Sequence, residues 1–172
     1  MKKIFYYLSI LLIYSSCNES KSNYLIKIIV GEFDEHGTPS GYINKEGDTI
    51  IPIGKYFYCY TDTIRDFGMV IKKGGPIIGI DKNDNELFEV YNFDNGPDYI
   101  KGGLFRIIKN DLIGYANING EIIIEPAYKC AFPFENGKAK VSNICTKKRI
   151  GEHSYWESNK WFYINKKGKR FE

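Results

Sequence analysis

The feature that most constrains this chain is an internal repeat. Four segments share one pattern, in which an apolar stretch, an Asn or Asp, a short polar turn and a second strand-like stretch follow one another: 41–51, 78–88, 114–124 and 162–172. Equivalent positions in these segments are separated by 37, 36 and 48 residues. Repeats of this length build stacked or propeller-like arrays, because a single unit cannot cover its own apolar face and its neighbours can.

Each copy predicts a tight hairpin at the same place. The turn begins at an Asn or Asp and carries a residue type that tolerates positive φ, namely Gly47, Asp84, Gly120 or Gly168. Farther along, a pattern that alternates with period two predicts one more strand, and its clearest form is Gly137-x-Ala139-x-Val141. Each unit is therefore predicted to be a three-stranded meander.

The repeats account for nearly all of the chain after residue 23. Residues 24–30 fit the last strand of a truncated earlier copy, and the copy that ends at Glu172 has only its hairpin. We therefore expect an all-β domain over residues 24–172, with about three and a half units in an elongated or curved array. An open stack and a propeller-like closure both fit, and the half unit favours the open stack. The 14 Tyr, 17 Gly and 6 Pro of the chain suit strands and turns.

This pattern resembles the bacterial WG-repeat family. The resemblance extends over residues 24–172, and the positions that carry it most clearly are Gly41, Tyr42, Gly47, Gly114, Tyr115, Gly120, Pro126, Tyr128, Phe134 and Gly137. The Trp-Gly pair of the family is missing, since Leu112-Ile113-Gly114 stands in its place. The resemblance implies a repeat scaffold that these residues help to build, and it implies no reaction.

The N-terminus predicts an export signal. Lys2 and Lys3 precede an apolar run over residues 4–14, which is too short for the roughly 20 residues of a membrane-spanning helix and fits a signal peptide. The run ends in Ser15-Ser16-Cys17, which resembles the lipobox of bacterial lipoproteins. We expect residues 1–16 to form a signal helix that is removed, Cys17 to carry the lipid and residues 17–23 to be a short tether. The alternative is an ordinary secretory signal or an uncleaved anchor.

These features place the mature chain in the cell envelope, as a membrane-anchored lipoprotein on the periplasmic or outer surface. Removal of Lys2 and Lys3 lowers the formal charge from +3 to +1, and so nearly neutral a domain argues against nucleic acid as a partner. The remaining cysteines are Cys59, Cys130 and Cys145, and their odd number allows at most one intramolecular disulfide among them.

No catalytic site is predicted. His36 and His153 lie in polar loops with no nucleophile motif beside them, and phosphate-binding glycine motifs are missing. The stretch 81–86 is similar to the start of a calcium loop, but the turn of the second repeat explains the same residues. The chain is thus predicted to use no metal and no cofactor and not to be an enzyme, with an envelope hydrolase as the third interpretation.

An insertion near residues 144–158, with the residues that follow it, supplies the candidate binding surface: Tyr155, Trp156 and Trp161. Flat aromatic faces can stack on sugars or hold a protein partner. The opposing interpretation is a long hairpin whose aromatic side chains fold back on the last repeat, in which case Trp156 is fully buried. We therefore expect a lipid-anchored, non-enzymatic interaction module with a protein partner, and as the alternative an envelope glycan-binding protein that uses residues 155–163.

Overall fold

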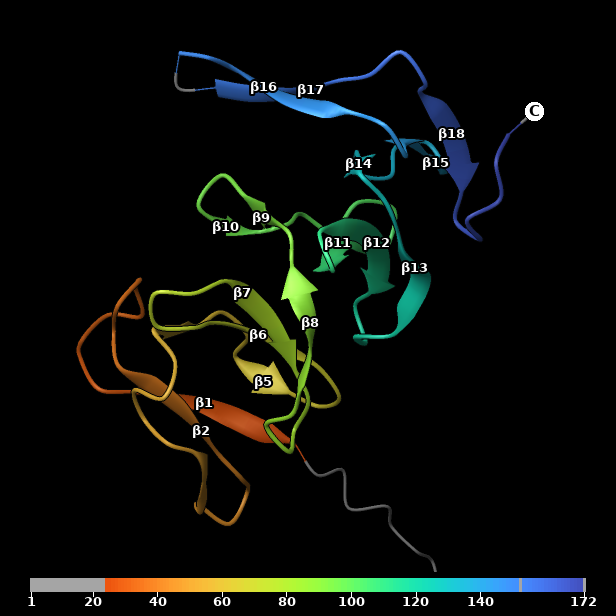
Figure 1. The fold of residues 1–172 in the computed structure, drawn as a ribbon. Coiled ribbons are helices and arrows are strands. Elements are labelled where there is room, and N and C mark those ends of the chain that lie inside the picture. Colours follow the sequence, from red (N-terminus) through yellow and green to blue (C-terminus); the bar gives the residue numbers. More distant parts are fainter. Residues whose placement is uncertain (1–23, 152, 172) are drawn as a thin grey trace, which may run out of the picture.

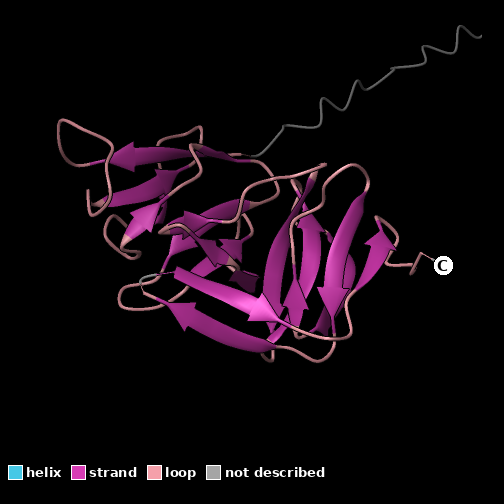
Figure 2. Cartoon of the chain, turned by 90° about the horizontal axis from the view of Figure 1, so that it is seen from above, coloured by secondary structure: helices cyan, strands magenta, loops and turns pink. Residues whose placement is uncertain are grey.

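The computed structural model describes residues 24–151 and 153–171. The predicted signal helix, Cys17 and the tether lie outside the described residues. The described chain is all-β, with strands joined by turns and loops and no helix (Figure 2), which confirms the predicted fold class. Accordingly, these residues contain no helix long and apolar enough to cross a membrane.

The strands follow the predicted repeat. The first unit comprises β1 (Leu25–Ile29), β2 (Ser40–Ile43) and β3 (Thr49–Ile51), followed by the short β4 (Tyr58–Cys59) and β5 (Thr63–Ile64). The second comprises β6 (Gly68–Ile71), β7 (Ile77–Ile80) and β8 (Glu86–Val90), followed by β9 (Asn92–Phe93) and β10 (Gly96–Pro97). The third comprises β11 (Leu104–Lys109), β12 (Leu112–Asn117) and β13 (Ile122–Tyr128), followed by β14 (Cys130–Ala131). The last has β15 (Lys138–Ser142) and β18 (Phe162–Asn165), with the insertion β16 (Thr146–Ile150) and β17 (His153–Glu157) between them.

Antiparallel pairing joins these strands into sheets. The first unit forms the sheet β3-β2-β1-β5, the second and third share the sheet β13-β12-β11-β8-β7-β6-β4, and the last forms β14-β15-β18. Strands β9–β10 and β16–β17 are separate hairpins. The first unit and β18 lie at opposite ends of the molecule (Figure 1), and no described strand of one pairs with the other. The array is therefore open, as the half unit suggested.

The four predicted turns have one hydrogen-bond pattern. In the third repeat, Asn117 N–H donates to the carbonyl of Glu121 and Gly120 N–H donates to the carbonyl of Asn117, both at 3.0 Å. The same pair of bonds starts at Asn44, Asp81 and Asn165. The Asp81 carboxylate accepts the backbone N–H groups of Asn83 and Asn85, each at 2.8 Å, so its oxygens serve the turn.

A second recurring device is the Gly-Tyr pair of β2 and β12. A Cβ atom at Gly114 would lie 2.4 Å from the carbonyl oxygen of Ile124, and one at Gly41 would lie 2.5 Å from that of Ile51. The next strand therefore approaches so closely that only glycine fits. The tyrosines that follow, Tyr42 and Tyr115, are fully buried, and their hydroxyls each donate a 2.7 Å hydrogen bond to a loop carbonyl.

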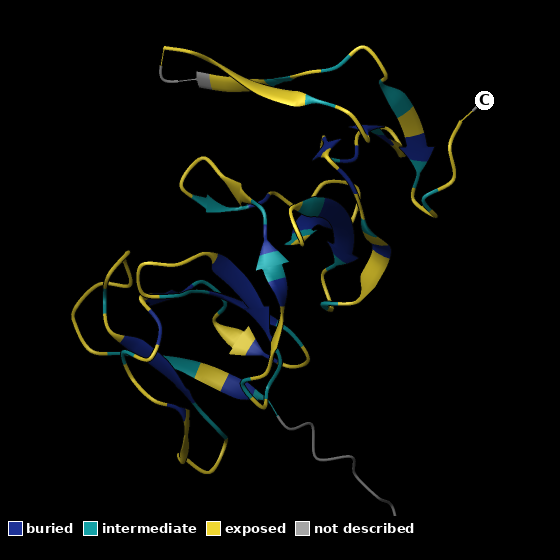
Figure 3. Cartoon of the chain, in the orientation of Figure 1, coloured by how far each residue is buried: buried dark blue, intermediate teal, exposed yellow. Residues whose placement is uncertain are grey.

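Three apolar clusters occur along the array, and they appear as the buried segments in Figure 3. Phe67 connects units, because its ring lies 5.7 Å from that of Phe88 and 5.6 Å from that of Phe105. It also packs under the third turn, since a Cβ at Gly120 would lie 2.6 Å from it. The fourth turn packs in the same way on Ile124, 3.5 Å from a Cβ at Gly168. The third and fourth turns thus rest on the preceding unit.

The other repeat residues also have structural places. Tyr128 and Phe134 are buried in the third-repeat cluster. Gly137 has a φ of 78°, and the nitrogen of Pro126 would lie 2.6 Å from a Cβ at Gly114.

The structure also shows which cysteines are paired. Cys130 and Cys145 form a disulfide that ties β14 to the start of the β16–β17 hairpin, whereas Cys59 is free and buried.

Candidate binding pocket

The β16–β17 hairpin leans over the second and third repeats, and Trp156 packs against the apolar cluster that the third and last repeats share. Trp156 is half-buried. Its ring lies 5.9 Å from that of Tyr91, which ends the second repeat, and 5.4 Å from that of Phe132, which follows β14. Both contacts are edge-to-face, the geometry that aromatic pairs favour. These contacts therefore hold the Trp156 ring in place, while part of its side chain stays exposed.

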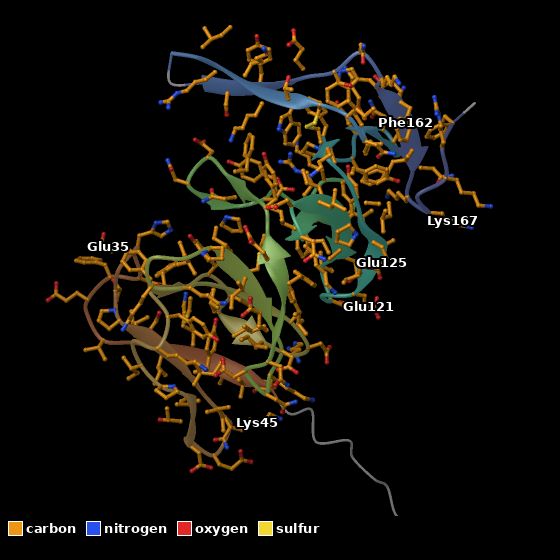
Figure 4. The ribbon with its side chains drawn as sticks, in the orientation of Figure 1. Glu35, Lys45, Glu121, Glu125, Phe162 and Lys167 are labelled. Atoms are coloured by element: carbon orange, nitrogen blue, oxygen red, sulfur yellow. A yellow bond between two sulfur atoms is a disulfide. The ribbon has the colours of Figure 1, made fainter. Side chains whose placement is uncertain are left out.

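A hollow of about 520 Å³ lies between this hairpin, the β9–β10 hairpin and β11. Its walls are mainly aromatic, formed by Tyr91, Phe93, Tyr99, Phe132, Tyr155 and Trp156. Its polar lining consists of Asp98, Lys101, Arg106, Lys147 and Ser154. A concave apolar site with a few convergent polar groups is typical of small-ligand pockets. We refer to it as the aromatic pocket. In Figure 4 the β16–β17 hairpin, which forms one side of it, lies far from the labelled Glu35 and Lys45 of the first unit.

A buried ion pair forms the floor of the aromatic pocket. The Arg106 guanidinium donates to both carboxylate oxygens of Asp98, with Nε–Oδ2 at 2.9 Å and Nη2–Oδ1 at 2.5 Å. Asp98 Oδ2 also accepts the Arg106 backbone N–H, and Arg106 Nη1 donates to the carbonyl of Ala131 at 3.1 Å. The two side chains are only 3% and 1% exposed. Bidentate, fully hydrogen-bonded geometry is what allows such a pair to be buried.

The guanidinium also stacks on an aromatic wall. Arg106 Cζ lies 4.0 Å from the centroid of the Tyr91 ring, within the range of a cation–π contact. Burial raises the pKa of the Tyr91 hydroxyl, and the nearby Arg106 charge opposes that shift only in part. Tyr91 therefore stays neutral at physiological pH and serves as an apolar surface with one polar end.

Two lysines make the rim basic. Lys147 is the cross-strand partner of Trp156 in the β16–β17 register, and Lys101 lies in the loop before β11. Both are exposed, and no described acidic side chain forms an ion pair with either. Because Asp98 compensates Arg106, the lysines leave the described lining with an excess of positive charge.

The structure separates Trp161 from the other two predicted binding residues. Tyr155 and Trp156 line the aromatic pocket, whereas Trp161 lines a neighbouring hollow with Phe162 and Arg170. Trp161 touches the wall of the aromatic pocket through Phe132, at a ring distance of 5.4 Å. The Lys140 ammonium lies 4.9 Å from the Trp161 ring. Only two of the three predicted aromatic residues therefore share one site.

The two histidines belong to different elements of the fold. His36 packs its ring against Tyr58 and Tyr60, at 5.0 and 5.4 Å, in the first unit. His153 begins β17, opposite Ile150 at the tip of the hairpin. Among the described residues, no group of three or more His, Cys, Asp or Glu is placed so that it could hold a metal ion.

Several pocket residues were not foreseen from the sequence: Tyr91, Phe93, Asp98, Tyr99, Lys101, Arg106 and Lys147. One signal was available. Arg106 interrupts the otherwise apolar run Leu104–Ile108, and a charge at an inward-facing strand position needs a buried partner. The partner itself, eight residues earlier, could not be chosen among the loop acids without the fold.

Comparison with known proteins supports the repeat. Residues 113–143 match the family model of the WG containing repeat. The matched segment runs from β12 to β15 and contains the Gly114-Tyr115 pair, the turn of the third repeat and Cys130. No curated protein and no solved structure matches the chain. The WG-type match thus covers one unit, and the other units share its turn geometry.

Proposed function

We propose that this chain is a non-enzymatic interaction module of the bacterial cell envelope, anchored by a lipid on Cys17, with a protein partner. A WG-type repeat suggests a repeat-built interaction module. The observation that carries the proposal is the position of the aromatic pocket. The β9–β10 and β16–β17 hairpins that form it lie away from β1, the first described strand, which the tether precedes, so a partner could approach it from the side away from the membrane (Figure 1).

The test is in-cell crosslinking of a C-terminally tagged chain, with labelled fatty acid to report lipidation. Wild type and Cys17→Ala are compared, and Tyr155→Ala serves as the surface variant because Tyr155 is 47% exposed. We expect a discrete protein partner that is captured from the anchored wild type and lost in both variants. Capture that is equal from Cys17→Ala would contradict the role of the anchor. A lipidated, folded chain that captures nothing would contradict the protein partner.

The second candidate is an envelope glycan-binding protein. The specific observation in its favour is that Trp156 is half-buried in the wall of a hollow and not sealed in the core. Aromatic rings held in this way present apolar faces at a small cost in conformational entropy. A glycan pulldown with wild type and Trp156→Ala tests it, and equal retention of both chains would argue against this candidate.

A further inference from the structure

We infer that the aromatic pocket binds an acidic saccharide, that is, a sugar that carries a carboxylate. This inference rests on the glycan-binding candidate and specifies its ligand class. The volume of about 520 Å³ is within the range of roughly 300–1,000 Å³ that small-ligand pockets occupy. The ligand class follows from the arrangement of the rings, from the hydrogen-bonding capacity of the lining and from its charge.

The rings suit a ligand with flat apolar faces. Tyr91 meets Trp156 at 69° and Phe93 meets Tyr99 at 64°, so both pairs are edge-to-face. In this geometry each pair leaves ring surface that the partner ring does not cover. Phe93 and Tyr99 are 45% and 56% exposed. A sugar ring has an apolar C–H face and polar edges, and can lie against such surfaces while its hydroxyls stay hydrated.

The described polar lining has no free carboxylate. Asp98 is the only carboxylate among the described lining residues, and all of its hydrogen bonds go to Arg106. The described lining has no Asn or Gln side chain. Lys101 and Lys147 offer ammonium donors, which have no acceptor capacity. A neutral sugar would find side-chain acceptors here only in the hydroxyls of Ser154 and the tyrosines, and it would leave the two ammonium groups without an anionic partner.

Charge then selects an acidic sugar. A carboxylate accepts hydrogen bonds and gains from ammonium groups, and those bonds are about twice as strong as neutral ones. Arg106 is not available for this role, because Asp98 and Ala131 already engage it. Lys101, in the loop before β11, and Lys147, on β16, line the same hollow and can both reach one ligand. Anionic headgroups of the anchoring membrane fit less well, because the β16–β17 hairpin that carries Lys147 lies far from β1, the strand that follows the tether (Figure 1).

The test uses the full-length protein in detergent and three probes: trigalacturonate, a hyaluronan tetrasaccharide and sialyllactose. Each is compared with its own methyl ester by titration calorimetry and tryptophan fluorescence. We expect at least one acid to bind about tenfold tighter than its ester, with the preference lost at high salt. Lys101→Gln with Lys147→Gln, both exposed positions, should abolish the preference. Trp156→Ala should weaken binding about tenfold or more, and the control Phe33→Ala, at an exposed aromatic residue outside the pocket lining, should leave it unchanged.

Two outcomes would overturn the inference. Equal binding of acids and esters would show that the pocket does not select charge, and no binding of any probe by the folded protein would remove it as an acidic-sugar site. If Trp156→Ala proves less stable than wild type, Tyr99→Ala at the exposed rim replaces it. The protein-partner proposal is scored separately by the in-cell crosslinking, so that failure of one does not count as failure of the other.

Discussion

The Tyr115 hydroxyl donates a 2.7 Å hydrogen bond to the carbonyl oxygen of Phe132. Tyr115 is the fully buried tyrosine of the Gly-Tyr pair in β12. Phe132 forms part of the wall of the aromatic pocket, and its ring contacts both Trp156 and Trp161. The repeat scaffold therefore positions the candidate site directly. Tyr42 makes the equivalent bond to Thr61 in the first unit, and Thr61 does not line the aromatic pocket.

Tyr115→Phe should destabilise the protein and loosen the pocket. Loss of a buried hydrogen bond, with the Phe132 carbonyl left unsatisfied, costs about 1–3 kcal/mol. Tyr42→Phe is the matched control and should cost a similar amount in urea unfolding. Only Tyr115→Phe should also change the fluorescence of Trp156 in the folded state. An identical emission spectrum in both variants would show that Phe132 is held by other contacts.

Removing one partner of the Arg106–Asp98 pair should lower the free energy of unfolding more than replacing both partners. Arg106→Met leaves a buried carboxylate without its partner, and Asp98→Leu leaves a buried guanidinium, so each should lose about 3–5 kcal/mol. The double variant removes both charges and should regain most of that loss. Chemical denaturation of all four proteins gives the coupling energy directly. Additive losses in the double variant would mean that the pair is not coupled.

The Cys130–Cys145 disulfide should stabilise the hairpin and its pocket. It closes a loop with a sequence separation of 15 residues, for which the chain-entropy model predicts about 3 kcal/mol. Cys145→Ser should lower the free energy of unfolding by about this amount and weaken saccharide binding, because the base of β16 is released. Cys59→Ala treated with reductant is the control, because it separates the loss of the disulfide from any effect of the free, buried Cys59 thiol. Reduction that leaves the wild-type melting temperature unchanged would contradict this prediction.

The period and the turns of this fold were readable from the sequence because they depend on local chemistry. Asn117 and Gly120 specify a turn through their own side-chain oxygen and positive φ, whatever surrounds them. The same holds at Asp81, where the carboxylate caps its own turn. Alternation in β15 likewise needs only the pleat of a strand.

The candidate site was only half predictable, because it depends on where distant segments meet. Nothing local to Trp156 indicates that its ring meets Tyr91, 65 positions earlier. The disulfide partner of Cys130 was equally open until the fold excluded the buried Cys59. The aromatic residues indicated a binding surface. Its positive charge comes from Lys101 and Lys147, which only the folded repeat array brings together.

The free energy of unfolding should fall more steeply with rising pH in the alkaline range than it does for an average β domain. Burial raises the pKa of Tyr42 and Tyr115 far above the usual value near 10. A raised folded-state pKa means that the stabilising contribution is complete below pH 10 and falls above it, because the unfolded chain then loses protons that the folded chain keeps. Each tyrosine should contribute about 1.4 kcal/mol per pH unit in that range. Melting curves from pH 8 to 11 should therefore be flatter for Tyr42→Phe with Tyr115→Phe. Parallel curves for the two proteins would count against this assignment.

The glycine of the Gly-Tyr pair provides the sharpest test of the repeat itself. Gly114→Ala places a Cβ 2.4 Å from the Ile124 carbonyl oxygen, which is rigid backbone of the neighbouring strand, so β12 and β13 must separate. Overpacking of this kind costs about 1–3 kcal/mol, and the disturbed hydrogen bonds of the ladder add to it. Gly96→Ala is the matched control, because a Cβ there meets nothing within 4 Å. We expect Gly114→Ala to lower the urea midpoint clearly and Gly96→Ala to leave it within error. Equal midpoints would show that the strands can separate at little cost, and the close approach would then not be the reason for glycine at this position.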